Sequence, residues 1–414
     1  MTRKWSLVLH LHQPPTQSLA VVKRAIKSSY LPLLEILSKH PNSGFTFNIS
    51  SSLTLQIKHL GATVFFDKIK SLAQNGQIEI LQSPFYHPLV PLTPASVILR
   101  QLEYHRDTIQ YYYNTTSNEI IYPPELAINP DNLLQVTSNK QPILVDESSV
   151  KRNFSLGTIS SPQVFDWQDR IIIASSRTIT EILRAYPTHL SHQALMNFIL
   201  QKTQANQTII SVSDGELFGH HYIERLNLLQ NLLQDQQIQF IKLSQAINNS
   251  NPTKLKEGSL HASSWEAQTN GLEKSIPYPI WSHPNNHLQT EYLKLADLAF
   301  NALDQTPRPD PDHQLQYSSA EKHYDYGTSS CHLFWLSNWP WWHPGLVEKG
   351  ARHLIQCVRT LPVSKTDKLH AESQYLSFLQ KLWQYHWSEK PLKSYHRFDL
   401  AKKELSDKLK EILT

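Results

Sequence analysis

The stretch TIISVSDGELFGHH, residues 208–221, decides the fold of this chain. Its first five residues are mostly β-branched or apolar, which is typical of a buried parallel strand. The strand ends abruptly at Asp214, so we expect this carboxylate at the carboxyl edge of a sheet, where α/β enzymes keep their chemistry. Gly215 and Gly219 allow the backbone to turn sharply beside it.

A second strand with the same kind of ending opens the chain. In WSLVLHLHQPP, residues 5–15, leucines alternate with Val8, His10 and His12, so both histidines lie on one face of the strand. The prolines that follow prevent the strand from continuing. A single histidine in such a place is more often a core residue, but a pair at a strand end favours a binding site.

Two further strand-like segments lead into carboxylates and prolines. Glu79 lies in GQIEILQ, residues 76–82, which is followed by His87 between a tyrosine and a proline. Glu125 ends EIIYPPE, residues 119–125. The alternatives are an exposed position on a half-buried strand for Glu79, and for Glu125 an acid in the first turn of a helix, where the helix dipole favours it.

Together these segments resemble glycoside hydrolase family 57. HLHQP at 10–14, GQIE at 76–79 with YHP at 86–88, PPE at 123–125 and DGE at 214–216 follow the order and roughly the spacing of the family's first four sequence blocks. The resemblance covers this part of the chain well and the remainder loosely. The third segment departs from the family, because it lacks the glycine and tryptophan that often precede the Pro-Glu pair.

The resemblance implies two catalytic carboxyl groups. Glu125 matches the family's nucleophile and Asp214 its acid/base. Cleavage of a glycosidic bond with retention needs the two groups about 5–5.5 Å apart. Like charges at that distance do not both ionise easily, so one group, Asp214 by this interpretation, is expected to hold a proton near neutral pH.

The resemblance also implies a set of substrate ligands. Imidazoles and carboxylates satisfy vicinal sugar hydroxyls, and aromatic rings stack on the apolar faces of sugars. The residues that match family motifs or suit these contacts are His10, His12, Gln13, Glu79, His87, Arg177, Trp265 and Trp341. A surface position is an equal alternative for Arg177, and core positions are an alternative for the two tryptophans.

Composition agrees with a neutral substrate. The chain has 39 basic and 35 acidic residues, a net charge of only +4, and no basic run longer than a few residues. Neither nucleic acid nor an anionic membrane surface is indicated as a partner. An oligo- or polysaccharide fits this balance, and the 10 Trp and 17 Tyr residues could contact it as well as fill cores.

Cysteine and targeting signals are sparse. Cys331 and Cys357 are too few for a disulfide framework, and their spacing matches no zinc pattern. We interpret them as free thiols of a cytoplasmic protein. The apolar run before His10 is too short for a signal peptide, and no stretch is long enough for a membrane span. No cofactor and no metal are indicated, and the oligomeric state is left open.

Strand-like and helix-like segments alternate through the first part of the chain, which predicts an α/β fold with a parallel sheet. About seven strands are found, and the resemblance implies an incomplete (β/α)7 TIM-like barrel over residues 1–250. Residues 251–414 begin with a polar connection and then show helical periodicity around 285–303, 346–358 and 368–387. We predict a helical C-terminal domain that contributes to the cleft.

The sequence therefore predicts a retaining glycosidase or transglycosidase that acts on α-glucan or related α-glycosides through a covalent intermediate on Glu125. One alternative is a metal-dependent hydrolase of the polysaccharide deacetylase kind, in which His10, His12 and Asp214 bind zinc. Another is an inactive glycan-binding protein on the same scaffold, suggested by the missing residues around Glu125. The sugar, the linkage, and the choice between hydrolysis and transfer are not determined.

Overall fold

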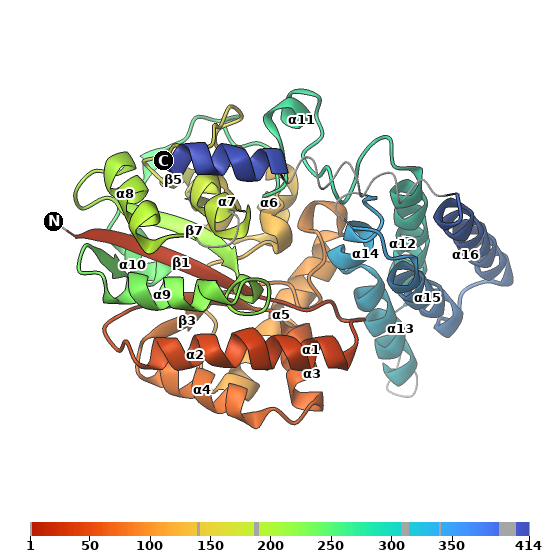
Figure 1. Cartoon of the computed structure of the whole chain (residues 1–414). Helices are drawn as coiled ribbons and strands as arrows, with labels where there is room; N and C mark the ends of the chain where they lie inside the picture. Colours follow the sequence, from red (N-terminus) through yellow and green to blue (C-terminus); the bar gives the residue numbers. More distant parts are fainter. Residues whose placement is uncertain are drawn as a thin grey trace.

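The structure, a computed structural model, describes residues 2–138, 141–185, 190–307, 314–338, 341–388 and 403–413. Figure 1 shows an α/β part, in which helices surround the strands, beside a bundle of long helices. One large apolar cluster lies within the α/β part, and a second fills the bundle and extends to Leu89, Val97 and Ala127. No helix in the described ranges is long and apolar enough to cross a membrane.

The α/β part alternates strands with helices, as the sequence predicts. Its elements are β1 (Arg3–Leu11), α1 (Leu19–Ala25), η1 (Ile26–Tyr30), α2 (Leu31–Ser38), β2 (Phe45–Ile49), α3 (Ser51–His59), α4 (Thr63–Gln74), β3 (Ile78–Ile80), η2 (Val90–Leu92), α5 (Ala95–Tyr113), η3 (Pro124–Leu126), α6 (Pro130–Val136), β4 (Ile143–Asp146), η4 (Glu147–Ser149), β5 (Val164–Trp167), β6 (Arg170–Ser175), α7 (Arg177–Ala185), α8 (His192–Lys202), β7 (Thr208–Asp214), η5 (Gly215–Leu217), α9 (Glu224–Gln234), β8 (Ile238–Phe240), α10 (Leu243–Asn248) and β9 (Thr253–Lys254). The strand expected at 119–122 is reduced to isolated bridges of Ile121 with Gln82 and Ile143.

The remaining elements are almost all helical, which agrees with the predicted periodicity. They are α11 (Thr269–Glu273), α12 (His287–Gln305), α13 (Gln314–Gly327), α14 (Ser330–Phe334), α15 (Pro344–Thr360) and α16 (Lys365–His386). Helices α12, α13, α15 and α16 form the bundle (Figure 1). The short helix α14 lies between the bundle and the α/β part, so it can carry side chains toward a site in the latter.

The strands of the described ranges form two sheets and not one closed barrel. The first has the parallel order β3-β2-β1-β7, with β8 also paired to β1, and the second has the order β4-β6-β5-β9. Residues 164–175 make a hairpin, because Gln168 and Asp169 both have positive φ (49° and 60°) and turn β5 back along β6. The predicted parallel α/β fold is confirmed, whereas the incomplete (β/α)7 barrel is not.

Strand β1 pairs with both β2 and β7, so it aligns the residues that form the candidate site. In these parallel registers His10 lies beside Asn48 on one side and beside Asp214 on the other. All three residues therefore lie at the carboxyl ends of neighbouring strands. The neighbouring apolar residues of β1, Leu9 and Leu11, are fully buried, which fixes the strand in the core.

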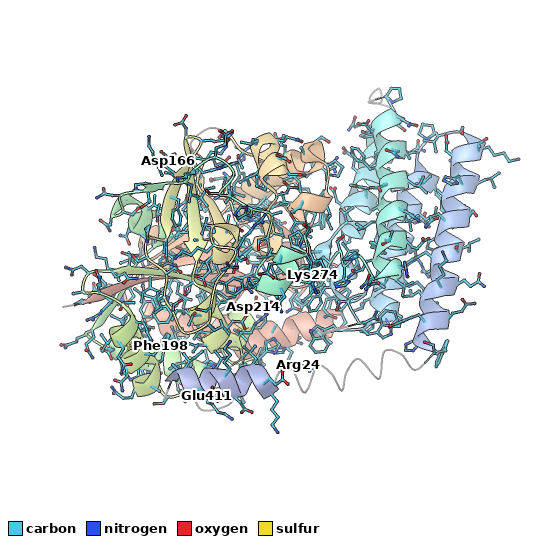
Figure 2. The ribbon with its side chains drawn as sticks, turned by 90° about the horizontal axis from the view of Figure 1, so that it is seen from above. Arg24, Asp166, Phe198, Asp214, Lys274 and Glu411 are labelled. Atoms are coloured by element: carbon cyan, nitrogen blue, oxygen red, sulfur yellow. The ribbon has the colours of Figure 1, made fainter. Side chains whose placement is uncertain are left out.

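Segments beyond residue 250, the predicted end of the first domain, also contact the α/β part. Strand β9 pairs with β5, and Ser263 forms a bridge with Ile128. Helix 403–413 also returns to the α/β part, where Leu409 is fully buried in the apolar cluster that contains Phe198. Figure 2 shows Glu411, on this helix, on the same side of the molecule as Phe198.

A buried ionic network joins α5 to the bundle. Arg100 donates from Nη2 to Asp325 Oδ1 and from Nη1 to Glu321 Oε1, each at 2.6 Å. Gln101 Nε2 donates to the same Asp325 oxygen at 3.0 Å. Asp325 is only 2% exposed, so its charge depends on these partners for compensation.

Arg100→Met should destabilise the protein by about 3–5 kcal/mol, because it leaves the Asp325 carboxylate buried without its cation. The double variant Arg100→Met/Asp325→Leu should lose less, since it removes both charges. Denaturant midpoints measure this. Arg106→Met, at an exposed position of the same helix, is the control and should change stability by less than about 0.5 kcal/mol. Equal losses in the Arg100 and Arg106 variants would contradict the assignment.

Candidate active site

His10 is a buried, neutral imidazole at the centre of the site. Its Nδ1 donates to Asn48 Oδ1 at 2.7 Å, and its ring stacks on Tyr122 with centroids 5.1 Å apart. Burial lowers the pKa of His10 to about 4, against a smaller raising effect of the Asn48 hydrogen bond. At neutral pH the ring therefore keeps Nε2 unprotonated, as an acceptor.

His12 and His87 come from different strand ends and stack face to face. Their ring centroids are 3.9 Å apart at an interplanar angle of 14°. His12 contacts Ser50 Oγ through Nδ1 (2.9 Å) and Cys331 Sγ through Nε2 (3.2 Å). Burial, reinforced by the neighbouring histidines, holds the pKa of both rings well below the usual value.

Glu125 lies in η3 with a left-handed backbone, φ 61°. Its carbonyl oxygen accepts from the Trp265 backbone N–H at 3.1 Å, and Oε1 accepts from Ser330 Oγ at 3.1 Å. A non-glycine residue in this conformation costs about 1–3 kcal/mol, so the surrounding contacts must hold it there. Burial, and then the charge of Asp214, raise the pKa of the carboxyl group to about 8.

Asp214 ends β7 and lies beside His10 in the register. Figure 2 shows it inside the α/β part. Burial raises its pKa to about 6, although the nearby Arg184 guanidinium opposes the shift. A small cavity of about 10 Å³, lined in part by Asp214, Arg184 and Trp265, adjoins the carboxyl group. The next residue, Gly215, packs so closely on Leu11 that a Cβ atom would collide with it.

Glu216 is a third buried carboxyl group, two residues beyond Asp214. The Tyr30 hydroxyl donates to its Oε1, and Gln13 Nε2 donates to the same oxygen at 3.3 Å. Burial and the charge of Asp214 raise the pKa of Glu216 to about 8. The sequence places Glu216 in a family motif but does not reveal this role. Gln13, a predicted substrate ligand, is engaged with Glu216 in this structure.

Arg177 is buried and positions another part of the site. Its guanidinium binds both oxygens of Asp146, through Nε at 2.9 Å and Nη2 at 2.6 Å. It also donates to the backbone oxygens of Ser264 (3.0 Å) and Ala267 (3.1 Å). With 2% exposure it is not a surface residue. Its contacts fix the segment that carries Trp265, whose ring meets His10 edge-on at 6.1 Å.

The structure does not bring Glu79 and Trp341 to this cluster. Glu79 accepts from Thr46 Oγ1 (2.8 Å), Asn118 Nδ2 (3.0 Å) and the Ser244 backbone N–H (3.0 Å). In the sheet, Glu79 is paired with Thr46 of β2. Thr46 lies two residues before Asn48, the residue of β2 that is paired with His10. Trp341 is 49% exposed, and its backbone contacts Ser337.

Three neighbours of the catalytic candidates were not found from the sequence. Tyr122 is fully buried, and its hydroxyl has no hydrogen-bond partner. Ser330 and Cys331 come from α14, more than 200 positions beyond Glu125. The only sequence signals were the place of Tyr122 before the Pro-Pro-Glu run and the aromatic residues that follow α14.

The zinc alternative predicted a ligand group of His10, His12 and Asp214. Among the described residues, the group whose possible ligand atoms come together is instead His12, His87 and Cys331, all within 4.8 Å of one another. His10 and Asp214 lie on neighbouring strands but do not complete such a group. This arrangement does not favour the deacetylase-like alternative.

Comparison with known proteins identifies the class to which this fold and site belong. The model of glycosyl hydrolase family 57 matches residues 6–259, which is more than half of the chain. The protein belongs to this family. The N-terminal resemblance of four short motifs is thereby confirmed at the level of the family.

Individual relatives match over shorter stretches. α-Amylase 1 of Dictyoglomus thermophilum is 33% identical over 99 residues, which cover 24% of this chain and 14% of that protein. The 4-α-glucanotransferase of Thermococcus litoralis is 31% identical over 99 residues, 24% of this chain and 15% of that protein. Its crystal structure has a TM-score of 0.64 at 17% identity and covers 87% of this chain and 60% of that chain.

A solved branching enzyme of Pyrococcus horikoshii shares the fold over most of both chains. Its TM-score is 0.66 at 12% identity, with 90% of this chain and 94% of that chain covered. Identity this low shows a common fold and nothing more specific. The matched segment spans only about a seventh of the first two relatives, so their activities are not transferred to this chain by similarity alone.

Arg177→Lys should lower the free energy of unfolding by about 2–4 kcal/mol, because one ammonium group cannot replace the paired contacts to Asp146 and the two carbonyl contacts at once. Denaturant midpoints at unchanged m-value measure the loss. Arg152→Lys, at an exposed position, serves as the control and should be nearly neutral. If the two variants melt alike, Arg177 does not hold the 264–267 segment.

Proposed function

We propose that this protein is a retaining glycosidase or transglycosidase that acts on α-glucan, with Glu125 as nucleophile and Asp214 as acid/base. The observation that carries the proposal is the pair of buried carboxyl groups, whose charges interact, beside neutral histidines. Membership of family 57 and the α-amylase and 4-α-glucanotransferase names of the relatives support the substrate class.

The proposed reaction needs one proton on the pair of carboxyl groups, Glu125 and Asp214. In the first step, Asp214 gives its proton to the glycosidic oxygen while the Glu125 carboxylate attacks the anomeric carbon, and the bond to the leaving glycan breaks. In the second step, Asp214 takes a proton from water or from a hydroxyl of another glycan, and that oxygen displaces Glu125. The choice of acceptor separates hydrolysis from transfer.

The proton must also move before the reaction. Glu125 has the higher pKa of the two in the ligand-free protein, about 8 against about 6 for Asp214, so the proton rests mainly on Glu125. Donors stabilise its ionised form, and Ser330 already supplies one at 3.1 Å. A sugar hydroxyl that donates to Glu125 would stabilise the ionised form further, while the glycosidic oxygen offers Asp214 an acceptor. Substrate binding thus favours the reactive arrangement.

The neutral histidines suit the binding of sugar hydroxyls. His10 presents an unprotonated Nε2 because its Nδ1 hydrogen is used by Asn48. A buried acceptor that a sugar hydroxyl satisfies discriminates strongly for that hydroxyl, since its loss leaves the nitrogen unpaired. Tyr122, stacked on His10, has a free buried hydroxyl that suits the same purpose.

Glu125→Gln and Asp214→Asn should each lower turnover of maltooligosaccharides by at least about 10³-fold while the melting temperature stays near that of the wild type, because both substitutions are close in shape. Products resolved by length report the reaction: shorter products alone indicate hydrolysis, and a ladder in both directions indicates transfer. Azide should restore turnover to Glu125→Ala by replacing the missing nucleophile.

Glu119→Gln, at an exposed position just before the Pro-Pro-Glu run, is the control and should retain full turnover. Near-normal activity of Asp214→Asn or Glu125→Gln would remove that residue from its assigned role. Binding of oligosaccharide by the wild-type protein with no turnover of any tested α-glucan would support the glycan-binding alternative.

The pH profile of kcat/KM should be bell-shaped, with limbs near pH 6 and pH 8. Below about pH 6 both carboxyl groups hold protons and no nucleophile remains, whereas above about pH 8 both are ionised and no acid remains. Initial rates at low substrate concentration measure the limbs. The Glu216→Gln variant tests whether this third group adds to the alkaline limb. A flat profile between pH 5 and pH 9 would contradict the shared proton.

A further inference from the structure

A cluster of three charged side chains lies beside the proposed acid, Asp214. The guanidinium of Arg184 binds both oxygens of Glu181, through Nη2 at 2.7 Å and Nε at 3.2 Å. Its Nη1 donates to Glu266 Oε1. Arg184 and Glu181 line the same cavity as Asp214, and its volume of about 10 Å³ has room for about one water molecule. Little water therefore separates the cluster from the acid.

The backbones that carry Arg184 and Asp214 are held together. Thr180, one helical turn before Arg184 on α7, donates from Oγ1 to Val212 O on β7 at 2.8 Å. Val212 precedes Asp214 by two residues. The Tyr222 hydroxyl, from the segment that follows η5, donates to Arg184 O at 3.1 Å. Contacts with both the strand and the segment after it therefore fix the end of α7 beside the acid.

The two carboxylates keep the guanidinium in place. The Arg184 side chain is 32% exposed, so without partners its charged end would turn into solvent. Its partners are less exposed, at 6% for Glu181 and 15% for Glu266. Hydrogen bonds from three nitrogens to ionised groups oppose that motion. Arg184 therefore presents a fixed positive charge at the cavity.

The other titratable groups near Asp214 supply no positive charge at neutral pH. His10, beside it on β1, is neutral because burial lowers its pKa. Burial raises the pKa of Asp214, the Arg184 guanidinium opposes this as the strongest nearby charge, and Glu266 adds to it more weakly. The groups that interact with the Asp214 charge from other elements are neutral or negative: Glu125 of η3, Glu216 of η5, Tyr30 of η1 and Tyr122.

We propose that Arg184 is a positioning residue of the reaction, which strengthens Asp214 as an acid by stabilising the carboxylate that forms when the proton leaves. This role rests on the proposed function. In the first step the proton passes from Asp214 to the glycosidic oxygen, and the negative charge left on Asp214 lies at the same cavity as the guanidinium. A charge that is fixed before the reaction stabilises this product without reorganisation. Glu266 has the opposite effect on the acid.

The acid limb of the kcat/KM profile tests this role. Arg184→Met should move the limb toward higher pH by about 0.5–1 unit, because loss of the cation raises the pKa of Asp214 above about 6. Glu266→Gln should move it toward lower pH. The double variant Arg184→Met/Glu266→Gln should still lie on the alkaline side, since the cation has the larger effect.

Tyr222→Phe is the structural control for this measurement. It removes the hydrogen bond to Arg184 O without a change of charge, so the acid limb should stay at its wild-type position. An unmoved limb in Arg184→Met, or shifts in the same direction in the Arg184→Met and Glu266→Gln single variants, would overturn the proposal. If Arg184→Met does not fold, Glu266→Gln decides: a limb that fails to move toward lower pH sinks the proposed charge balance.

The leaving group separates an effect on the acid from a loss of packing. At the pH optimum of each variant, Arg184→Met should lower kcat/KM for maltooligosaccharides at least about threefold. For 4-nitrophenyl α-maltotrioside, whose phenolate leaves with little help from an acid, kcat/KM should change by less than about 1.5-fold. Arg184→Lys keeps the charge and should recover most of the loss. Equal losses on both substrates would give Arg184 a packing role only.

Asp214→Asn, measured on the same two substrates, separates the two ways of failing. If Asp214→Asn spares the aryl glycoside relative to the maltooligosaccharides and Arg184→Met does not, the role of Arg184 is wrong and the proposed function stands. If Asp214→Asn slows both substrates equally, Asp214 is not the acid, and the role of Arg184 fails with it.

Discussion

The parallel pairing of β1 with β2 and β7 is the constraint on which the site depends. It places His10 level with Asn48 and Asp214 at the carboxyl ends of three neighbouring strands. Leu9 and Leu11 on the other face are fully buried in the apolar core, so a shift of one residue would move them into the site and turn the histidines into the core. The hydrophobic core therefore fixes the register of the strands, and the register determines which side chains lie side by side in the site.

Burial has one physical effect with two opposite consequences at this site. It disfavours every charged form, so it lowers the pKa of His10 to about 4 and raises the pKa of Glu125 to about 8 and of Asp214 to about 6. The imidazoles become neutral hydrogen-bond groups, and the pair of carboxyl groups retains one proton near neutral pH. One protonated and one ionised carboxyl group can thus coexist near neutral pH, as the proposed acid and nucleophile require.

Sequence patterns predicted the features that depend on residues close together in the chain. The buried run before Asp214 and the alternation around His10 gave two neighbouring strands of one parallel sheet, and four motifs gave the family. They missed one local reversal of the chain and the contacts between residues far apart in the sequence. The hairpin at Gln168 and Asp169, which reverses one strand, rests on two positive φ angles, and neither residue is a glycine that would have marked the turn. Nothing near Arg177 indicated that its partners lie 31, 87 and 90 positions away.

The site residue that is hardest to predict from the sequence, Ser330, comes from the helical part of the chain. The Ser330 backbone N–H donates to His87 O at 2.9 Å, and Ser329 forms a bridge with Pro88, so α14 is joined to the loop that carries His87. Arg100, in the helix that follows this loop, anchors Asp325 just before α14. These connections, at Asp325, at Ser329 and at the Ser330 backbone, hold the Ser330 hydroxyl against Glu125. Since the Ser330 hydroxyl lowers the pKa of Glu125, the packing of the helical part against the α/β part influences the protonation of this carboxyl group.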